Sequence, residues 1–240
     1  MHRPLIVALD FKDRLNVAQF LAKFDKEKLF VKIGMELFYS VGPSIIEDIK
    51  KDEHKVFLDL KLHDIPNTVH HAMKVLAHYE VDIVNVHATG GRKMMEAALE
   101  GLDAGTRIGI NRPMCLAVTQ LTSSTEAMIR DELLISQSMD ETVLHYAEQA
   151  YNSGLDGVVC SAREVPHIYR KLPTSFHTVT PGIRMQSDNT HDQNRVVTPA
   201  QARENGSTGI VVGRSITKAD VPLNMYKLMK RDWEGVIYNE

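Results

Sequence analysis

The sequence has little cysteine, no strong charge of either sign and no long apolar run. Its 240 residues include two cysteines, both in apolar strand-like segments, which argues against an oxidising compartment and for buried thiols in a reducing cytoplasm. The net charge is −3 and the basic residues are dispersed, so the basic patch of a nucleic-acid-binding protein is missing. No apolar run approaches the ~18 residues that a membrane span requires. We therefore expect a cytoplasmic protein that binds neither nucleic acid nor membrane.

Three further features are missing. Residues 1–4 lead directly into an apolar run, so we expect no signal peptide. The 11 histidines are scattered and no two form a recognisable ligand pair, so no metal site is expected. No GxGxxG motif follows the first apolar run, which counts against a dinucleotide-binding fold. The hydrophobic fraction of 43% and the charged fraction of 25% are those of a globular protein.

Apolar strand-like runs alternate with segments of helical spacing along the whole chain. The predicted strands are 5–10, 29–34, 55–58 continuing into 59–64, 82–87, 113–119, 156–160, 176–180 and 209–213. The predicted helices are 14–26, 42–51, 66–79, 91–102, 140–153, one from about 162, 199–204 and 221–231, with a longer insert at 120–138. This alternation predicts an α/β fold, a closed (β/α)8 TIM barrel formed by a single domain of residues 1–240.

The third predicted strand ends in charged residues. Asp59 and Lys61 lie two residues apart, so their side chains share one face of the strand, and Asp64 follows on the turn. Burying such charges costs several kcal/mol per ion, so a fold that places them there uses them. The alternative is an exposed salt bridge on an edge strand.

Two neighbouring predicted strands also end in charges, Asp10 and Lys32. Taken singly, Asp10 could cap a helix and Lys32 could extend to solvent. The carboxyl ends of all strands meet at one mouth of such a barrel, where its catalytic residues lie. The alternating acids and bases therefore predict an electrostatically coupled active site at this mouth.

A second candidate site follows the last two strands, where many such barrels bind phosphate. Gly213 allows close approach of the backbone, and Arg214 offers a planar, permanently charged fork. Arg184 ends the seventh strand, and the polar segment 185–196, which includes Gln193, is typical of a lid. The alternatives are an ordinary turn at Gly213 and a plain disordered loop at 185–196.

At these residues the sequence closely resembles the bacterial-type orotidine 5′-monophosphate decarboxylases, over nearly the whole chain. The matching motifs are VALD at 7–10, VKIG at 31–34, FLDLKLHDIPNT at 57–68, VHA at 86–88 with GG at 90–91, AVTQLTS at 117–123, TPGIR at 180–184 and VGRSIT at 212–217.

The resemblance implies catalytic roles. Lys61 would protonate C6 of the pyrimidine, Asp59 would lie beside the substrate carboxylate, and Lys32 would join this array and contact the ribose. Asp64, with Ile65 and Thr68, would reach into the site of a partner subunit, which implies a homodimer with shared active sites. The other implied substrate-binding residues are Asp10 for the ribose, Thr122 near the pyrimidine, and Arg184, Gln193, Gly213 and Arg214 for the phosphate.

The implied reaction converts orotidine 5′-monophosphate to uridine 5′-monophosphate in pyrimidine biosynthesis, without metal or cofactor. Loss of CO2 leaves a carbanion in the ring plane with no electron sink, so the available means are electrostatic: Asp59 would crowd the departing carboxylate, and Lys61 would stabilise and then protonate the developing negative charge. Two alternatives stay open. One is a Mg2+-dependent lyase similar to 3-keto-gulonate 6-phosphate decarboxylase, which shares the Asp-x-Lys-x-x-Asp motif. The other is a non-catalytic nucleotide-phosphate sensor.

Overall fold

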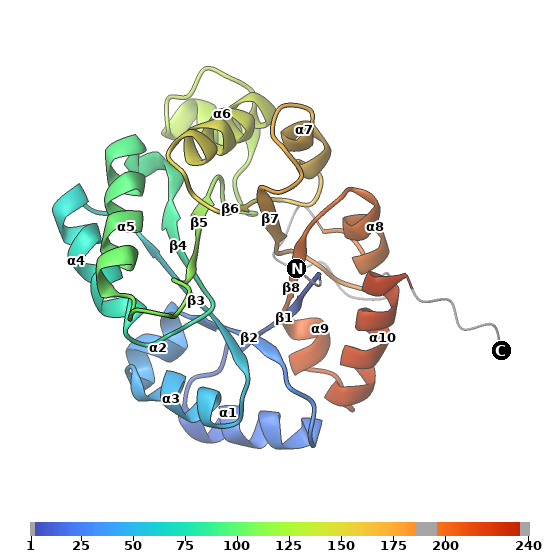
Figure 1. Ribbon diagram of the computed structural model, residues 1–240. Coiled ribbons are helices and arrows are strands. Elements are labelled where there is room, and N and C mark those ends of the chain that lie inside the picture. Colours follow the sequence, from blue (N-terminus) through green and yellow to red (C-terminus); the bar gives the residue numbers. More distant parts are fainter. Residues whose placement is uncertain (1–2, 186–195, 236–240) are drawn as a thin grey trace.

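A computed structural model describes residues 3–185 and 196–235. Within these residues, eight parallel strands form a closed barrel in which each strand pairs with the next and β8 pairs with β1 (Figure 1). The strands are β1 (Leu5–Ala8), β2 (Phe30–Gly34), β3 (Lys55–Leu62), β4 (Ile83–His87), β5 (Met114–Val118), β6 (Gly157–Val159), β7 (His177–Thr180) and β8 (Gly209–Val212). The predicted (β/α)8 barrel is confirmed.

Helices form a ring outside the strands (Figure 1). They are α1 (Arg14–Leu21), η1 (Ala22–Phe24), α2 (Met35–Val41), α3 (Ser44–Lys51), α4 (Pro66–Ala77), η2 (Ala88–Gly90), α5 (Arg92–Gly105), η3 (Met128–Glu132), α6 (Met139–Asn152), α7 (Val165–Tyr169), α8 (Pro199–Glu204), α9 (Arg214–Thr217) and α10 (Pro222–Glu234). No helix in the described ranges is long and apolar enough to cross a membrane.

Several helix boundaries differ from the prediction. The first predicted helix is divided into α1 and η1, and α2 was not predicted at all. Pro43 is the N-cap residue of α3 rather than a residue of its first turn. The short helix α9, which begins at Arg214, was also missed because it is only four residues long.

Apolar side chains form two concentric layers. An inner cluster fills the barrel and comprises Ile6, Ala8, Phe57, Ile83, Leu116, Val179 and Val211. A larger cluster lies between the strands and the helices and includes fully buried Trp233 of α10. Because burying one large apolar side chain contributes about 1.5–3 kcal/mol, these layers hold the strand ends in fixed positions. The strand ends therefore offer a rigid support for polar side chains.

Candidate active site

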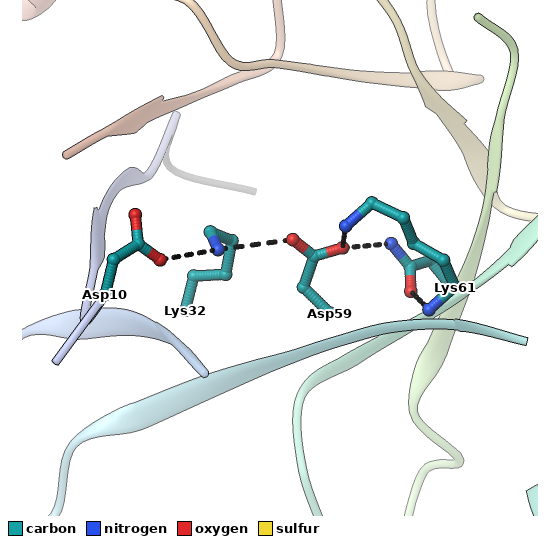
Figure 2. A network of polar contacts seen from close by, with 5 residues as sticks. Asp10, Lys32, Asp59 and Lys61 are labelled. Carbon is teal, nitrogen blue, oxygen red and sulfur yellow. Dashed lines mark hydrogen bonds and ion pairs between the residues drawn. The ribbon is translucent and has the colours of Figure 1, made fainter. Parts of the chain in front are cut away.

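Four alternating charges form a continuous chain of ion pairs at the carboxyl ends of β1, β2 and β3, here named the charged array: Asp10, Lys32, Asp59 and Lys61 (Figure 2). Lys32 Nζ lies 3.3 Å from Asp10 Oδ1 and 3.2 Å from Asp59 Oδ2. Lys61 Nζ donates a 2.7 Å hydrogen bond to the other oxygen, Oδ1, of Asp59. The predicted shared face of Asp59 and Lys61, and its link to neighbouring strand ends, is confirmed.

The exposed fraction of the side chains differs along the charged array, and neighbouring charges decide the ionisation of its buried members. The side chain of Asp10 is 61% exposed, whereas that of Asp59 is 12% exposed. Burial acts to raise the pKa of Asp59, but Lys32 and Lys61 outweigh it and lower that pKa. Burial likewise acts to lower the pKa of Lys32, but Asp59 and Asp10 outweigh it and raise that pKa. Asp59 and Lys32 are therefore both charged at neutral pH.

Lys61 holds an unusual backbone conformation. Its φ of 53° lies in the left-handed region, which costs a non-glycine residue about 1–3 kcal/mol and persists only where its surroundings impose it. The pairing of β3 with β4 shifts register between Leu58 and Leu62, so Lys61 belongs to an irregular stretch of the strand. Strained residues of this kind are concentrated at functional sites.

Asn85 of β4 contacts the array and was missed by sequence reasoning. Its side chain accepts a hydrogen bond from the Lys61 backbone N–H and donates one to Asp59 Oδ1. The available signal was an asparagine within the apolar run 83–86, since asparagine is depleted in strands.

A cavity of about 660 Å³ adjoins the charged array. Its lining includes all four residues of the array together with Thr122, Arg184, Gly213 and Arg214. The acids and bases of the charged array and the described residues predicted to bind phosphate thus line the same cavity. A larger hollow of about 1010 Å³ lies along α10 in the outer helical layer, away from the array.

Gly213 follows β8 and is the N-cap residue of α9. A Cβ atom added there would lie 3.7 Å from both Ala8 Cβ and Asp10 Oδ2, which is ordinary van der Waals distance. Neighbouring protein atoms therefore leave room for a side chain at this position. Gly213 lines the cavity, and the lack of a side chain there allows a ligand to approach its backbone closely, which the predicted phosphate binding requires.

Three predicted site residues do not line this cavity. Asp64, Ile65 and Thr68 lie on the turn after β3 and in the first turn of α4, within a run of exposed residues, 63–68. Asp64 Oδ1 accepts a 2.6 Å hydrogen bond from the Ile65 N–H. Gln193 and most of the predicted lid lie outside the described residues.

Two histidines border the array. The rings of His63 and His87 lie 5.7 Å apart, and burial, with smaller contributions from His63 and Lys61, lowers the pKa of His87. Among the side chains that the structure describes, no group of three or more His, Cys, Asp or Glu residues is arranged to hold a metal ion.

A parallel eight-stranded barrel with coupled acids, bases and arginines around the cavity at its carboxyl mouth defines a TIM-barrel enzyme. Comparison with known proteins specifies the family. Residues 3–229 match the family described as "Orotidine 5'-phosphate decarboxylase / HUMPS family". The chain belongs to this family.

Individual relatives agree with this assignment. A curated orotidine 5'-phosphate decarboxylase from Bacillus cereus is 58% identical over 236 residues, which cover 98% of this chain and 99% of that protein. The crystal structure of orotidine 5'-phosphate decarboxylase from Lactobacillus acidophilus has a TM-score of 0.87 and 43% identity, with 96% of this chain and 99% of that chain covered. An uncharacterized conserved protein from Geobacillus kaustophilus has a TM-score of 0.87 and 53% identity, with 96% and 100% covered.

Proposed function

We propose that this chain decarboxylates orotidine 5′-monophosphate to uridine 5′-monophosphate in pyrimidine biosynthesis, as one catalytic domain without metal or cofactor. The observation that carries the proposal is that one cavity of about 660 Å³ is lined by both the Asp59–Lys61 pair and Arg184 and Arg214. The names of the curated relatives, at 58% identity, support orotidine 5′-monophosphate as the substrate.

In the proposed mechanism, Asp59 and Lys61 act on the reacting carbon. The substrate carboxylate lies beside Asp59, where two negative charges repel each other until CO2 departs. The Lys61 ammonium, 2.7 Å from Asp59 Oδ1, stabilises the carbanion left at C6 and then protonates it. Since Lys32 neutralises the other oxygen of Asp59, Asp59 stays ionised in this buried position.

The remaining residues bind parts of the substrate that are distant from the reacting carbon. We assign Asp10 and Lys32 to the ribose and Thr122 to the pyrimidine. The residues assigned to the phosphate are Arg184, Gln193, the backbone of Gly213, and Arg214. Binding energy from this remote phosphate is available to hold the ring against the charged array.

We also propose that the active form is a homodimer. The exposed run 63–68 begins two residues after Lys61, so a second subunit packed on this mouth could bring its Asp64, Ile65 and Thr68 to the neighbouring cavity. This arrangement explains why Asp64, Ile65 and Thr68, which match the family motif, do not line the cavity of their own chain. It would add a second carboxylate near the Lys61 ammonium.

Turnover in the presence of a chelator tests the proposal. We expect the purified chain to consume orotidine 5′-monophosphate, seen as loss of orotate absorbance, at the same rate with and without excess EDTA. The reason is that the proposed mechanism uses only repulsion of the substrate carboxylate by Asp59 and stabilisation of the carbanion by the Lys61 ammonium. A 3-keto-gulonate 6-phosphate substrate with added Mg2+ serves as the comparison.

The other outcomes identify the alternatives. Activity that EDTA removes and Mg2+ restores would favour the metal-dependent lyase, which shares the Asp59-x-Lys61-x-x-Asp64 motif. Tight binding of the nucleotide without any loss of absorbance would favour a non-catalytic sensor. The second alternative gives no reason for the buried Lys32–Asp59–Lys61 arrangement.

Arg214→Ala is expected to weaken substrate binding. A hydrogen bond to a charged group contributes about 1.5–3 kcal/mol, so KM should rise roughly 10- to 150-fold. The measurement is steady-state kinetics together with the Kd of uridine 5′-monophosphate. Arg231→Ala is the matched control, because Arg231 is an exposed arginine of α10 that does not line the cavity. Unchanged KM and kcat in Arg214→Ala would remove Arg214 from the phosphate site.

A further inference from the structure

Asn85 is a deeply buried polar side chain that contacts the charged array. It is 1% exposed and lies in the middle of β4, between Val84 and Val86. A buried amide is stable only when its donor and acceptor are both paired. The side chain of Asn85 is paired with two groups of β3, and both belong to the array.

The pairing of β3 with β4 explains why an amide is needed there. Leu58 pairs with Val84 and Leu62 pairs with Val86, so the three residues from Asp59 to Lys61 stand opposite Asn85 alone. Such a bulge takes backbone groups out of the regular ladder. The Lys61 N–H is one of these groups, and it donates a 2.8 Å hydrogen bond to Asn85 Oδ1 instead of to a backbone carbonyl.

The nitrogen of the same side-chain amide binds the Asp59 carboxylate. Asn85 Nδ2 donates a 2.7 Å hydrogen bond to Asp59 Oδ1, the oxygen that also accepts from Lys61 Nζ at 2.7 Å. One side chain thus fixes the main chain of Lys61 and the carboxylate that its ammonium contacts. The left-handed φ of 53° at Lys61 requires such external support.

We propose that Asn85 is a positioning residue, which aims the Lys61 ammonium by holding the Lys61 backbone and the Asp59 carboxylate together. This inference rests on the proposed function for its kinetic consequence, since it concerns the proposed proton donor. Asn85 does not line the cavity, so it acts through Lys61 and Asp59 rather than on the substrate. An apolar residue such as the flanking valines would fill the strand but could not satisfy either group.

The kinetic test compares Asn85→Ala with the unaltered protein. Misplacement of a reacting group by about 1 Å can reduce the rate about 100-fold, so we expect kcat to fall by roughly that factor. KM and the Kd of uridine 5′-monophosphate should change by less than about threefold, because the phosphate residues are untouched. Asn205→Ala is the matched control: Asn205 Nδ2 donates a 2.9 Å hydrogen bond to the Ala162 carbonyl, and Asn205 does not line the cavity. It should retain kcat.

Hydrogen exchange at the Lys61 amide gives a readout that does not depend on activity. In the unaltered protein this amide should exchange slowly, and in Asn85→Ala it should exchange faster. Asn85→Asp retains an acceptor for the Lys61 N–H, but a carboxylate oxygen replaces the amide N–H that donates to Asp59. That variant should keep slow exchange at Lys61 and still lose kcat.

The outcomes separate the two proposals. Absence of turnover in the unaltered protein rejects the proposed function, while slow exchange at Lys61 would still support the contact with Asn85. An active unaltered protein with full kcat in Asn85→Ala overturns the positioning role alone. Should neither variant fold, fast exchange of the Lys61 amide in the unaltered protein would still overturn it.

Discussion

Replacing Lys61 by alanine should abolish decarboxylation while largely sparing binding of uridine 5′-monophosphate. Loss of the ammonium removes both the proton donor and the charge that stabilises the carbanion, so kcat should fall by about 10⁴-fold or more. Arg184 and Arg214 lie elsewhere in the cavity lining and remain, so the product Kd should change by less than about tenfold. Single-turnover kinetics and a product-binding titration measure the two effects.

Lys55→Ala is the control for Lys61→Ala. Lys55 begins the same strand but is exposed and lies outside the cavity, so its loss should leave kcat and Kd unchanged. Substantial residual turnover in Lys61→Ala would count against the assigned role. Loss of product binding in the same variant would show instead that the substitution had disturbed the whole site.

Mixing two inactive variants should restore activity if the site is shared between subunits. Asp64→Ala and Lys61→Ala homodimers should each have little activity, because every site lacks one of the two groups. In a heterodimer, one site lacks both groups and the other has both. After subunit exchange in an equal mixture, half the dimers are heterodimers with one intact site of two, so about a quarter of the unaltered activity should return.

The control for this experiment is a mixture of Lys61→Ala with Asp59→Ala, two residues assigned to the same subunit's site. In that heterodimer each site lacks one group, so mixing should restore nothing. Equal activities before and after mixing Asp64→Ala with Lys61→Ala, once heterodimers are detected by mass, would mean that each chain works alone.

The charges at the strand ends could be predicted because they obey local rules. The two-residue spacing of Asp59 and Lys61 predicts that their side chains project the same way, and their 2.7 Å contact agrees with this although the stretch forms a bulge against β4. Asp10 and Lys32 follow from the same logic once the strands are parallel and adjacent. Their ion pairs, at 3.3 Å and 3.2 Å from Lys32 Nζ, agree with that expectation.

The role of Asn85 could not be predicted in the same way. Its contacts depend on how β3 and β4 align, and the shift in register between Leu58 and Leu62 leaves no mark in either strand read alone. The left-handed φ of Lys61 is equally hidden, since a lysine at the end of an apolar run gives no sign of it. Both features arise from long-range strand pairing rather than from local composition.

The backbone conformation of Lys61 has a consequence for how this protein can change. Glycine adopts a φ of 53° without steric conflict, so glycine at position 61 would relieve the backbone strain. It would also remove the ammonium that pairs with the buried Asp59 carboxylate, and losing one partner of a buried ion pair is itself destabilising. The strain at residue 61 therefore cannot be removed without disturbing Asp59, which ties the backbone conformation of Lys61 to the charge that it carries.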